Sequence, residues 1–182
     1  MTALPDAYAD LIAEGEHLDK LVAGLDPAQW ALPTPAPGWT IAHQVAHLAS
    51  IVRLAATAAS DPAAFEAQTA GAAADFDGAV HRALLPYLAE PPQTLLRRRR
   101  DQRAAATAAL AAVPPDQTVP WLARPLPPTV LASAGIMELF AHGQDIADTV
   151  GMHREQTDRI RHLVGFGACR SGLPPPARSA SA

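Results

Sequence analysis

The chain has 182 residues, 49% hydrophobic and only 5% aromatic, and this length suits one well-packed domain. Its formal net charge of −4 argues against nucleic acid or an anionic membrane surface as a partner. The N-terminus carries acidic residues where a signal peptide carries basic ones, and no apolar run reaches the length of a membrane span. Since Cys169 is the only cysteine, we expect no internal disulfide and a cytoplasmic location.

The first half of the chain predicts two long helices joined by a proline-rich link. Apolar residues at helical spacing, such as Leu11 and Leu18, predict a helix over residues 7–24. The link at residues 26–37 contains Trp30, which we expect to fold back over the end of a bundle. The second helix begins at about Thr40, a residue type that caps helices, and extends to about residue 60.

Prolines divide the second half. Asp61 and Pro62 predict the cap and first turn of a further helical stretch, while prolines 86, 91 and 92 are expected to break the chain beyond it into shorter pieces. Helices are predicted at 75–88, 93–113 and 129–150, the last ending at Gly151. The loop between the last two is too rich in proline to be helical, and its Trp121 resembles Trp30 in its setting. These elements predict an all-α four-helix bundle with a long crossover segment.

Four consecutive arginines, Arg97 to Arg100, are the one strongly basic run. On a helix these side chains point in different directions around the axis, so they form no single stripe. The adjacent Asp101 and the acidic balance of the chain also argue against a nucleic-acid site. We therefore expect this run to be a solvated helix face.

Two groups of potential metal ligands lie almost a hundred residues apart. His43 and His47 lie one turn apart beside the apolar stripe of the second helix, and Glu138, His142 and Asp145 lie on one line of the last helix. Neutral imidazoles and a carboxylate are common ligands of zinc and related divalent metals. The alternative is that each histidine is an isolated, hydrogen-bonded residue of the core or rim, which is the commoner situation for a single histidine.

The segment PGWTIAHQVAHLA, followed downstream by MELFAHGQDIAD, resembles the N-terminal domain of mycothiol-dependent maleylpyruvate isomerases, a branch of the DinB-like metal-binding four-helix bundles. The resemblance implies that His47, Glu138 and His142 bind a divalent metal, usually zinc, with Ni²⁺, Fe²⁺ and Mn²⁺ as alternatives. Trp39 matches the tryptophan that precedes the histidine helix in the family. His43 and Asp145 lie outside the usual triad and are expected to orient a ligand imidazole or a bound water.

The resemblance also implies a metal-dependent transferase or isomerase that uses a low-molecular-weight thiol, mycothiol or a close relative, together with a small electrophilic substrate. Two alternatives stay open: a metal-binding bundle with a hydrolytic or unknown activity, and a non-catalytic binding or stress-response module. Neither nucleic acid nor a membrane is expected as a partner. A homodimer is one alternative for its assembly.

The domain organisation follows from the same resemblance. Residues 1–166 form the metal-binding bundle, and residues 167–182 are a disordered tail rich in proline, serine and arginine. Relatives commonly continue past the bundle into a smaller α/β domain. The change of composition at about Ala168, after a helical segment at 159–166, is as consistent with a truncated or frame-shifted ending as with a native one.

Overall fold

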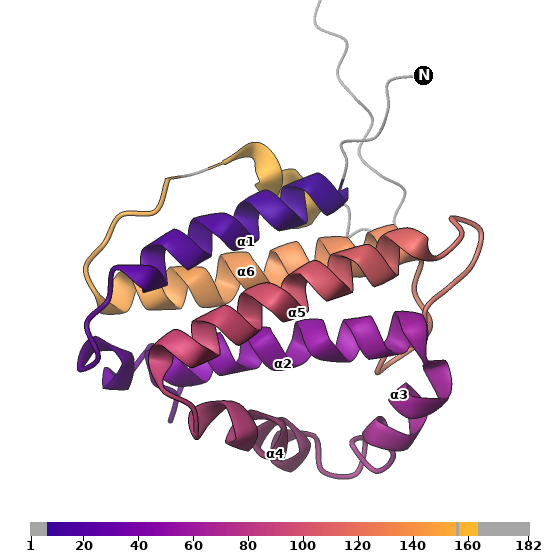
Figure 1. Cartoon of the computed structure of the whole chain (residues 1–182), viewed down its shortest axis with the longest axis horizontal. Coiled ribbons are helices and arrows are strands. Elements are labelled where there is room, and N and C mark those ends of the chain that lie inside the picture. Colours follow the sequence, from indigo (N-terminus) through magenta and orange to yellow (C-terminus); the bar gives the residue numbers. More distant parts are fainter. Residues whose placement is uncertain (1–6, 156, 164–182) are drawn as a thin grey trace, which may run out of the picture.

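The computed structural model describes residues 7–155 and 157–163. Its four long helices are α1 (Ala7–Ala23), α2 (Ile41–Ser60), α5 (Pro92–Ala112) and α6 (Pro128–Thr149). Figure 1 shows α1 and α6 running in one direction and α2 and α5 in the other. The described residues contain no strand, apart from isolated bridges that pair Pro33 with Thr40 and Val119 with Leu126. The all-α prediction is confirmed.

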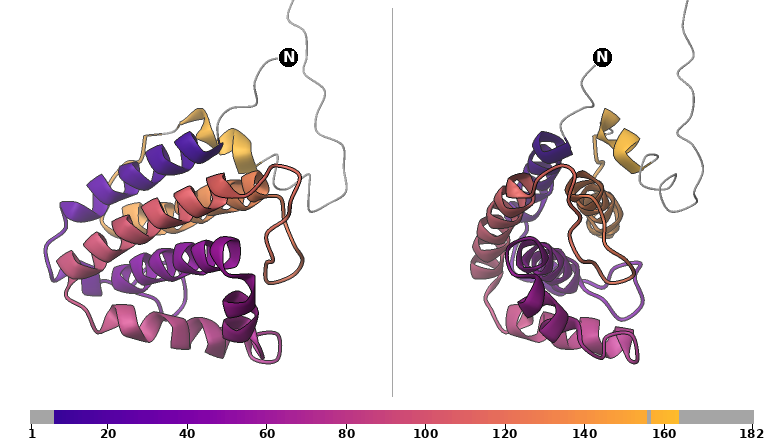
Figure 2. Two further views of the ribbon diagram at one scale, coloured as in Figure 1. Left: turned by 45° about the vertical axis from the view of Figure 1, so that its right-hand side comes forward. Right: turned by 90° about the vertical axis from the view of Figure 1, so that its right-hand side faces the viewer.

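The bundle is closed by contacts between α1 and α5, α5 and α2, α2 and α6, and α6 and α1, an order that is visible end-on in Figure 2. Because α2 and α5 run in the same direction, the chain must return between them. It does so through α3 (Pro62–Thr69) and α4 (Phe76–Leu88), which pack against the outer side of α2. This return is the long crossover expected from the sequence.

Local capping sets where the crossover helices begin. The side chain of Asp61 accepts a hydrogen bond from the backbone N–H of Ala64 at 3.0 Å, and Asp75 accepts one from Gly78 at 3.0 Å. The expectation that Pro86 breaks the helix is wrong, because Pro86 lies inside α4. A proline so close to the helix end removes little backbone hydrogen bonding, and the neighbouring Tyr87, 1% exposed, anchors the last turn in the core.

Two apolar clusters hold the helices together. The larger contains residues of α1, α2, α4, α5 and α6, and it includes Trp30, only 3% exposed, from the 3₁₀ helix η1 (Gln29–Ala31). The smaller cluster contains Phe65 of α3, against which Trp121 stacks with ring centroids 5.9 Å apart and planes 17° from parallel. Both tryptophans therefore pack onto the bundle from the loops that carry them, as the sequence predicted.

The arginine run is not a solvated face. Arg99 is 2% exposed and forms an ion pair with Asp19 of α1. The carboxylate of Asp19 also forms ion pairs with Arg103 at 2.9 Å and with Arg100 at 3.4 Å. Burial lowers the pKa of Arg99 to about 10, and the charge of Asp19 opposes that shift, so Arg99 is still a cation at neutral pH. Arg98 lies 4.2 Å from the centre of the Tyr87 ring. The run therefore joins α5 to α1 and α4.

After α6 the chain returns along α1. Arg154 and Arg159 both form ion pairs with Glu14 of α1, which is 1% exposed, and His162 lies 2.7 Å from a carboxylate oxygen of Asp10. The helical segment predicted at 159–166 begins as the 3₁₀ helix η2 (Asp158–Ile160) and continues as a helical turn through residue 163. Residues 164–166 and the predicted tail at 167–182 lie outside the described residues. None of the helices that the structure describes is long and apolar enough to cross a membrane.

Candidate metal centre

Three of the side chains singled out in the sequence converge where α2 packs against α6. The Nε2 atom of His47 lies 3.2 Å from Oε2 of Glu138, and the Nε2 atom of His142 lies 3.1 Å from the same oxygen. All three potential ligand atoms lie within 4.8 Å of one another. The packing of the two helices therefore brings together residues that are 91 positions apart in the chain.

The three side chains are partly buried, with 15%, 26% and 18% of His47, Glu138 and His142 exposed. Trp39, just before α2, covers them: its ring stacks on His142 with centroids 5.8 Å apart and planes 13° from parallel, and its centroid lies 5.3 Å from that of His47. The site is thus shielded from bulk water on the side of Trp39 but is not sealed.

A glutamine that the sequence analysis did not identify holds one of the imidazoles. Gln44 is fully buried, and its amide nitrogen donates hydrogen bonds to Asp145 Oδ2 at 2.9 Å and to Thr34 Oγ1 at 2.8 Å. These acceptors fix the orientation of the amide, so that its Oε1 faces the Nδ1 atom of His142. His142 must therefore donate a proton from Nδ1, which leaves the lone pair of Nε2 free to point at Glu138.

This arrangement suits a cation. The unprotonated Nε2 of neutral His142 and the carboxylate oxygen of Glu138 are both acceptors, and two acceptors 3.1 Å apart repel each other unless a proton or a metal ion lies with them. A ligand imidazole whose other nitrogen donates to a buried oxygen is the usual arrangement around protein-bound metals. The residues present therefore fit a divalent metal.

The lowered pKa of Glu138 also indicates a site that suits a cation. Burial on its own raises the pKa of this carboxyl, but hydrogen bonds from His142 and His47 outweigh it and lower the pKa to about 2. Glu138 is therefore an anion throughout the physiological pH range.

The two supporting residues expected from the sequence lie in different settings. Asp145 accepts a hydrogen bond from Gln44, and Gln44 in turn contacts His142, so Asp145 supports the imidazole of His142 indirectly. The Nδ1 atom of His43 instead accepts a hydrogen bond from the backbone N–H of Thr40, 3.3 Å away, and so helps to cap the start of α2. Burial, and to a smaller extent the nearby His81, lowers the pKa of His43. Its ring lies 6.4 Å from that of Trp39.

A signal for Gln44 was present in the sequence. It lies three residues before His47, so it shares a side of α2 with that residue, and a polar residue between Ile41 and Val45 of the apolar stripe requires a buried partner. The pairing with Asp145 could not be predicted, because it depends on how α2 and α6 are rotated against each other.

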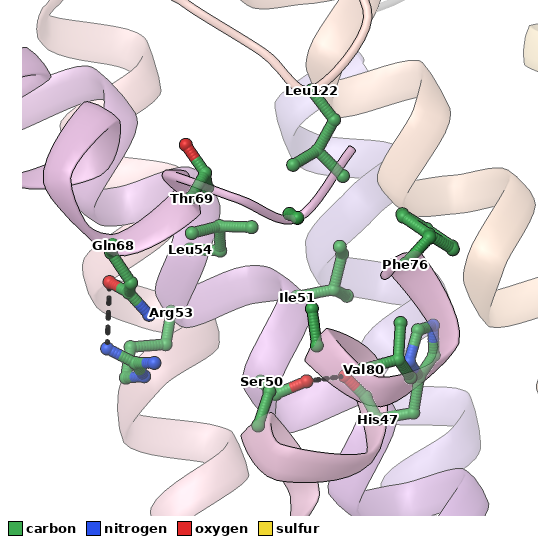
Figure 3. Close-up of a pocket in the computed structure, with 13 residues that line it drawn as sticks. His47, Ser50, Ile51, Arg53, Leu54, Gln68, Thr69, Phe76, Val80 and Leu122 are labelled. Atoms are coloured by element: carbon green, nitrogen blue, oxygen red, sulfur yellow. Dashed lines mark hydrogen bonds between the residues drawn. The ribbon is translucent and has the colours of Figure 1, made fainter. Parts of the chain in front are cut away.

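A pocket of about 110 Å³ opens beside His47, between α2 and the crossover helices α3 and α4. Figure 3 shows the side chains of Ile51, Leu54, Val80 and Leu122 around this space, with His47 at its edge. The pocket and the metal centre therefore share one residue. His47 also carries a buried Nδ1 atom with no hydrogen-bond partner among the described residues.

Residues 11–147 match the family model of the mycothiol maleylpyruvate isomerase N-terminal domain. Uncharacterized proteins from two strains of Mycobacterium tuberculosis, CDC 1551 / Oshkosh and ATCC 25618 / H37Rv, are 43% identical over 176 residues, which cover 93% of this chain and 68% of each relative.

Solved structures share the fold. The crystal structure of the mycothiol-dependent maleylpyruvate isomerase superimposes with a TM-score of 0.68 at 16% identity, and that of a mutant of the same enzyme superimposes with a TM-score of 0.67. Each match covers 92% of this chain and 69% of the solved chain. At this identity the likeness concerns the path of the helices alone.

Proposed function

Because the chain belongs to the mycothiol maleylpyruvate isomerase N-terminal domain family, we propose that it binds a divalent metal and uses it with a low-molecular-weight thiol in a transfer or isomerisation reaction. The metal ligands are His47, Glu138 and His142. The observation that carries the proposal is the convergence of two imidazole nitrogens and one carboxylate oxygen within 4.8 Å, at the interface of α2 and α6.

Zinc is the metal that this ligand set favours. Two histidines and one glutamate form a catalytic type of zinc site, since three protein ligands leave a position for water or substrate. Ni²⁺, Fe²⁺ and Mn²⁺ accept the same ligands, and metal analysis of the purified protein distinguishes them. The partial exposure of His47, Glu138 and His142 is consistent with access to that open position.

The proposed chemistry concerns a thiol. A divalent cation held by these ligands would lower the pKa of a thiol that binds beside it and so supply the nucleophilic thiolate at neutral pH. Neighbouring residues would position the ligands. Gln44 and Asp145 keep His142 in the tautomer whose Nε2 faces the site. Trp39 restricts the access of water to both imidazoles. The thiolate sulfur then adds to an electrophilic carbon of the second substrate.

Mycothiol is the proposed thiol, because the solved structure with this fold is named as a mycothiol-dependent enzyme. The test combines metal analysis with thiol conjugation. Purified protein loaded with Zn²⁺ is mixed with mycothiol and a panel of electrophiles, and loss of free thiol is followed against His142→Ala as a control. We expect one metal per chain and conjugation that requires it. Stoichiometric metal with neither thiol binding nor conjugation would favour a hydrolytic or purely metal-binding role instead.

A further inference from the structure

The segment after α6, which we call the return segment (residues 151–163, except residue 156), contacts the back of the candidate metal centre. Figure 1 shows it leaving the end of α6 and running beside α1. The two proposed ligands of α6 lie on the side that meets α2, whereas Phe140, midway between them in the chain, lies about 180° around the helix axis. Arg154 of the return segment donates a hydrogen bond from Nη1 to the backbone carbonyl of Phe140 at 2.9 Å. It therefore contacts the helical turn that carries both ligands, from the opposite side.

The same guanidinium is fixed to α1. Its Nη2 forms an ion pair with Glu14, and only 8% of the Arg154 side chain and 1% of the Glu14 side chain are exposed. Its Cζ atom also lies 5.4 Å from the centre of the Phe140 ring. The planar fork of an arginine can donate to two acceptors at once, in a fixed geometry. Arg154 thus ties the ligand-bearing turn of α6 to a buried carboxylate of α1.

Gly143, which follows His142 in the chain, makes room for this contact. A Cβ atom at this position would lie 2.8 Å from Nη1 and 3.0 Å from Cζ of Arg154. Any side chain here would therefore displace the guanidinium. Glycine is less favourable than alanine in the interior of a helix, and the φ angle of Gly143 does not require it. The passage of Arg154 accounts for its presence.

Glu14 has a second cation in the return segment. The Nε atom of Arg159 donates to Oε2 of Glu14 at 2.9 Å. In the described part of the chain, the side chain of Arg159 forms no hydrogen bond to α6, whereas that of Arg154 does. The two arginines share one buried carboxylate, so either can be replaced while Glu14 keeps a counter-ion. Arg159 is therefore a matched control for Arg154.

We propose that Arg154 is a positioning residue of the metal centre, and that docking of the return segment and binding of the metal stabilise each other. The inference rests on the metal-binding part of the proposed function and is independent of the thiol reaction. Ligands have to be held within about 0.5 Å of their productive positions. Arg154 holds the ligand-bearing turn of α6 against α1. Coupling of this kind is reciprocal, so the factor by which docking raises metal affinity is also the factor by which metal strengthens docking.

Arg154→Gln tests the contact, because a glutamine cannot reach Phe140 and Glu14 together. Competition against a chromophoric chelator should show Zn²⁺ binding weakened about tenfold, whereas Arg159→Gln should stay within about twofold of the wild type. In the Co²⁺-loaded protein, the visible absorption bands report the coordination geometry. They should change in Arg154→Gln and not in Arg159→Gln. Equal Zn²⁺ affinity in Arg154→Gln and the wild type, or an equal loss in the two variants, would overturn the inference.

Gly143→Ala displaces Arg154 without removing a charge. It should weaken Zn²⁺ binding, although alanine favours the helix. In the Arg154→Gln background the added Cβ meets no guanidinium, so the same substitution should leave the affinity unchanged. An equal loss in both backgrounds would show that the substitution acts on His142 directly, and would overturn the role of Arg154. Helical circular dichroism must be the same in all variants.

The reciprocal effect is measured on the wild-type chain. Arg161 is paired with Asp10 and Asp158 in the docked return segment, and trypsin cleavage after it is followed by mass spectrometry. Zn²⁺ should slow this cleavage about tenfold, and should have no effect in the control variant His47→Ala. Cleavage of the wild type at the same rate with and without bound Zn²⁺ would overturn the coupling and leave the metal site intact.

Failure of the proposed function gives different results. Wild-type protein that binds neither Zn²⁺ nor Co²⁺ would overturn the ligand assignment and this inference together. Protein that binds Zn²⁺ with the expected dependence on Arg154, but conjugates no thiol, would support the inference and overturn only the thiol reaction.

Discussion

Gln44 of α2 joins His142 of α6 through its side-chain oxygen, and its amide nitrogen is held by Asp145 at 2.9 Å. The orientation of the imidazole in the candidate metal centre is therefore decided by a buried amide on the opposite helix. Hydrogen bonds to the second nitrogen of a ligand histidine select its tautomer and raise its basicity. Substitution of Gln44 should therefore weaken metal binding.

Gln44→Met should weaken metal binding by about 10- to 100-fold, the usual effect of removing a residue that supports a ligand histidine. The substitution keeps the volume of the side chain but removes the acceptor for Nδ1 of His142. Competition for Zn²⁺ against a chromophoric chelator measures the change. The matched control is Gln144→Met, an exposed glutamine on α6. Equal Zn²⁺ affinity in the two variants would show that Gln44 has no such role.

His47→Ala should remove the metal and leave most of the helix content, because one of three ligands is lost while the core is held by apolar residues such as Ile41 and Leu48. Elemental analysis gives the metal content, and far-ultraviolet circular dichroism gives the helix content. His153→Ala, an exposed histidine beyond α6, serves as the control and should retain metal. Stoichiometric metal in His47→Ala would refute its assignment as a ligand, whereas loss of helix would show that the metal maintains the fold.

The lowered pKa of Glu138 predicts a dependence of stability on pH in metal-free protein. Because the folded-state pKa of about 2 lies below the ordinary value of 4.5, the ionised carboxylate stabilises the fold above pH 4.5, and this contribution is lost as the pH falls toward 2. The full contribution is on the order of 3 kcal/mol. Urea unfolding of the wild type and Glu138→Gln between pH 5 and pH 3 tests this prediction.

In that comparison the free energy of unfolding should fall more steeply with acidification in the wild type than in Glu138→Gln, which has no charge to lose. Glu16→Gln, at an exposed position of α1, should follow the wild type. Parallel curves for all three proteins would mean that the two histidines do not stabilise the Glu138 carboxylate in solution.

In the buried ion pair of Asp19 and Arg99, removal of Asp19 should cost more stability than removal of Arg99. Asp19→Ala leaves the guanidinium of Arg99 buried without a counter-ion, and we expect it to destabilise the protein by about 3–5 kcal/mol. Arg99→Met should cost less, since Asp19 would retain Arg100 and Arg103. Urea denaturation measures both, with Asp101→Ala, exposed on α5, as the control. A larger loss for Arg99→Met than for Asp19→Ala would contradict this account.

The bounds of the four long helices could be predicted to within one residue, because capping residues and prolines mark them in the sequence, although Pro86 lies inside α4. The prediction began α2 at Thr40, which caps a helix that runs from Ile41, and began a stretch at Asp61, which caps α3. The convergence of His47 with Glu138 and His142 was also expected, since their spacing puts each group on one helical face and the resemblance pairs the two faces. Their role as metal ligands stays a prediction.

Pairings between helices were harder to predict. The burial of Arg99 follows from its position one turn after Leu95 and Leu96, on the inner face of α5, but only the presence of Asp19 on the facing helix makes a buried cation acceptable. The network of Gln44 and Asp145 likewise depends on the rotation of α2 against α6. A sequence pattern specifies the face of each helix, whereas the partner across the interface is set by packing.

The separation of 91 residues between His47 and Glu138 has a consequence for folding kinetics. A site whose ligands come from α2 and α6 exists only after the crossover and the last helix have docked, so a metal ion has little to bind in the transition state for folding. Metal should therefore leave the folding rate nearly unchanged and slow unfolding. The bound ion would then lengthen the lifetime of the folded bundle without taking part in the nucleation of folding.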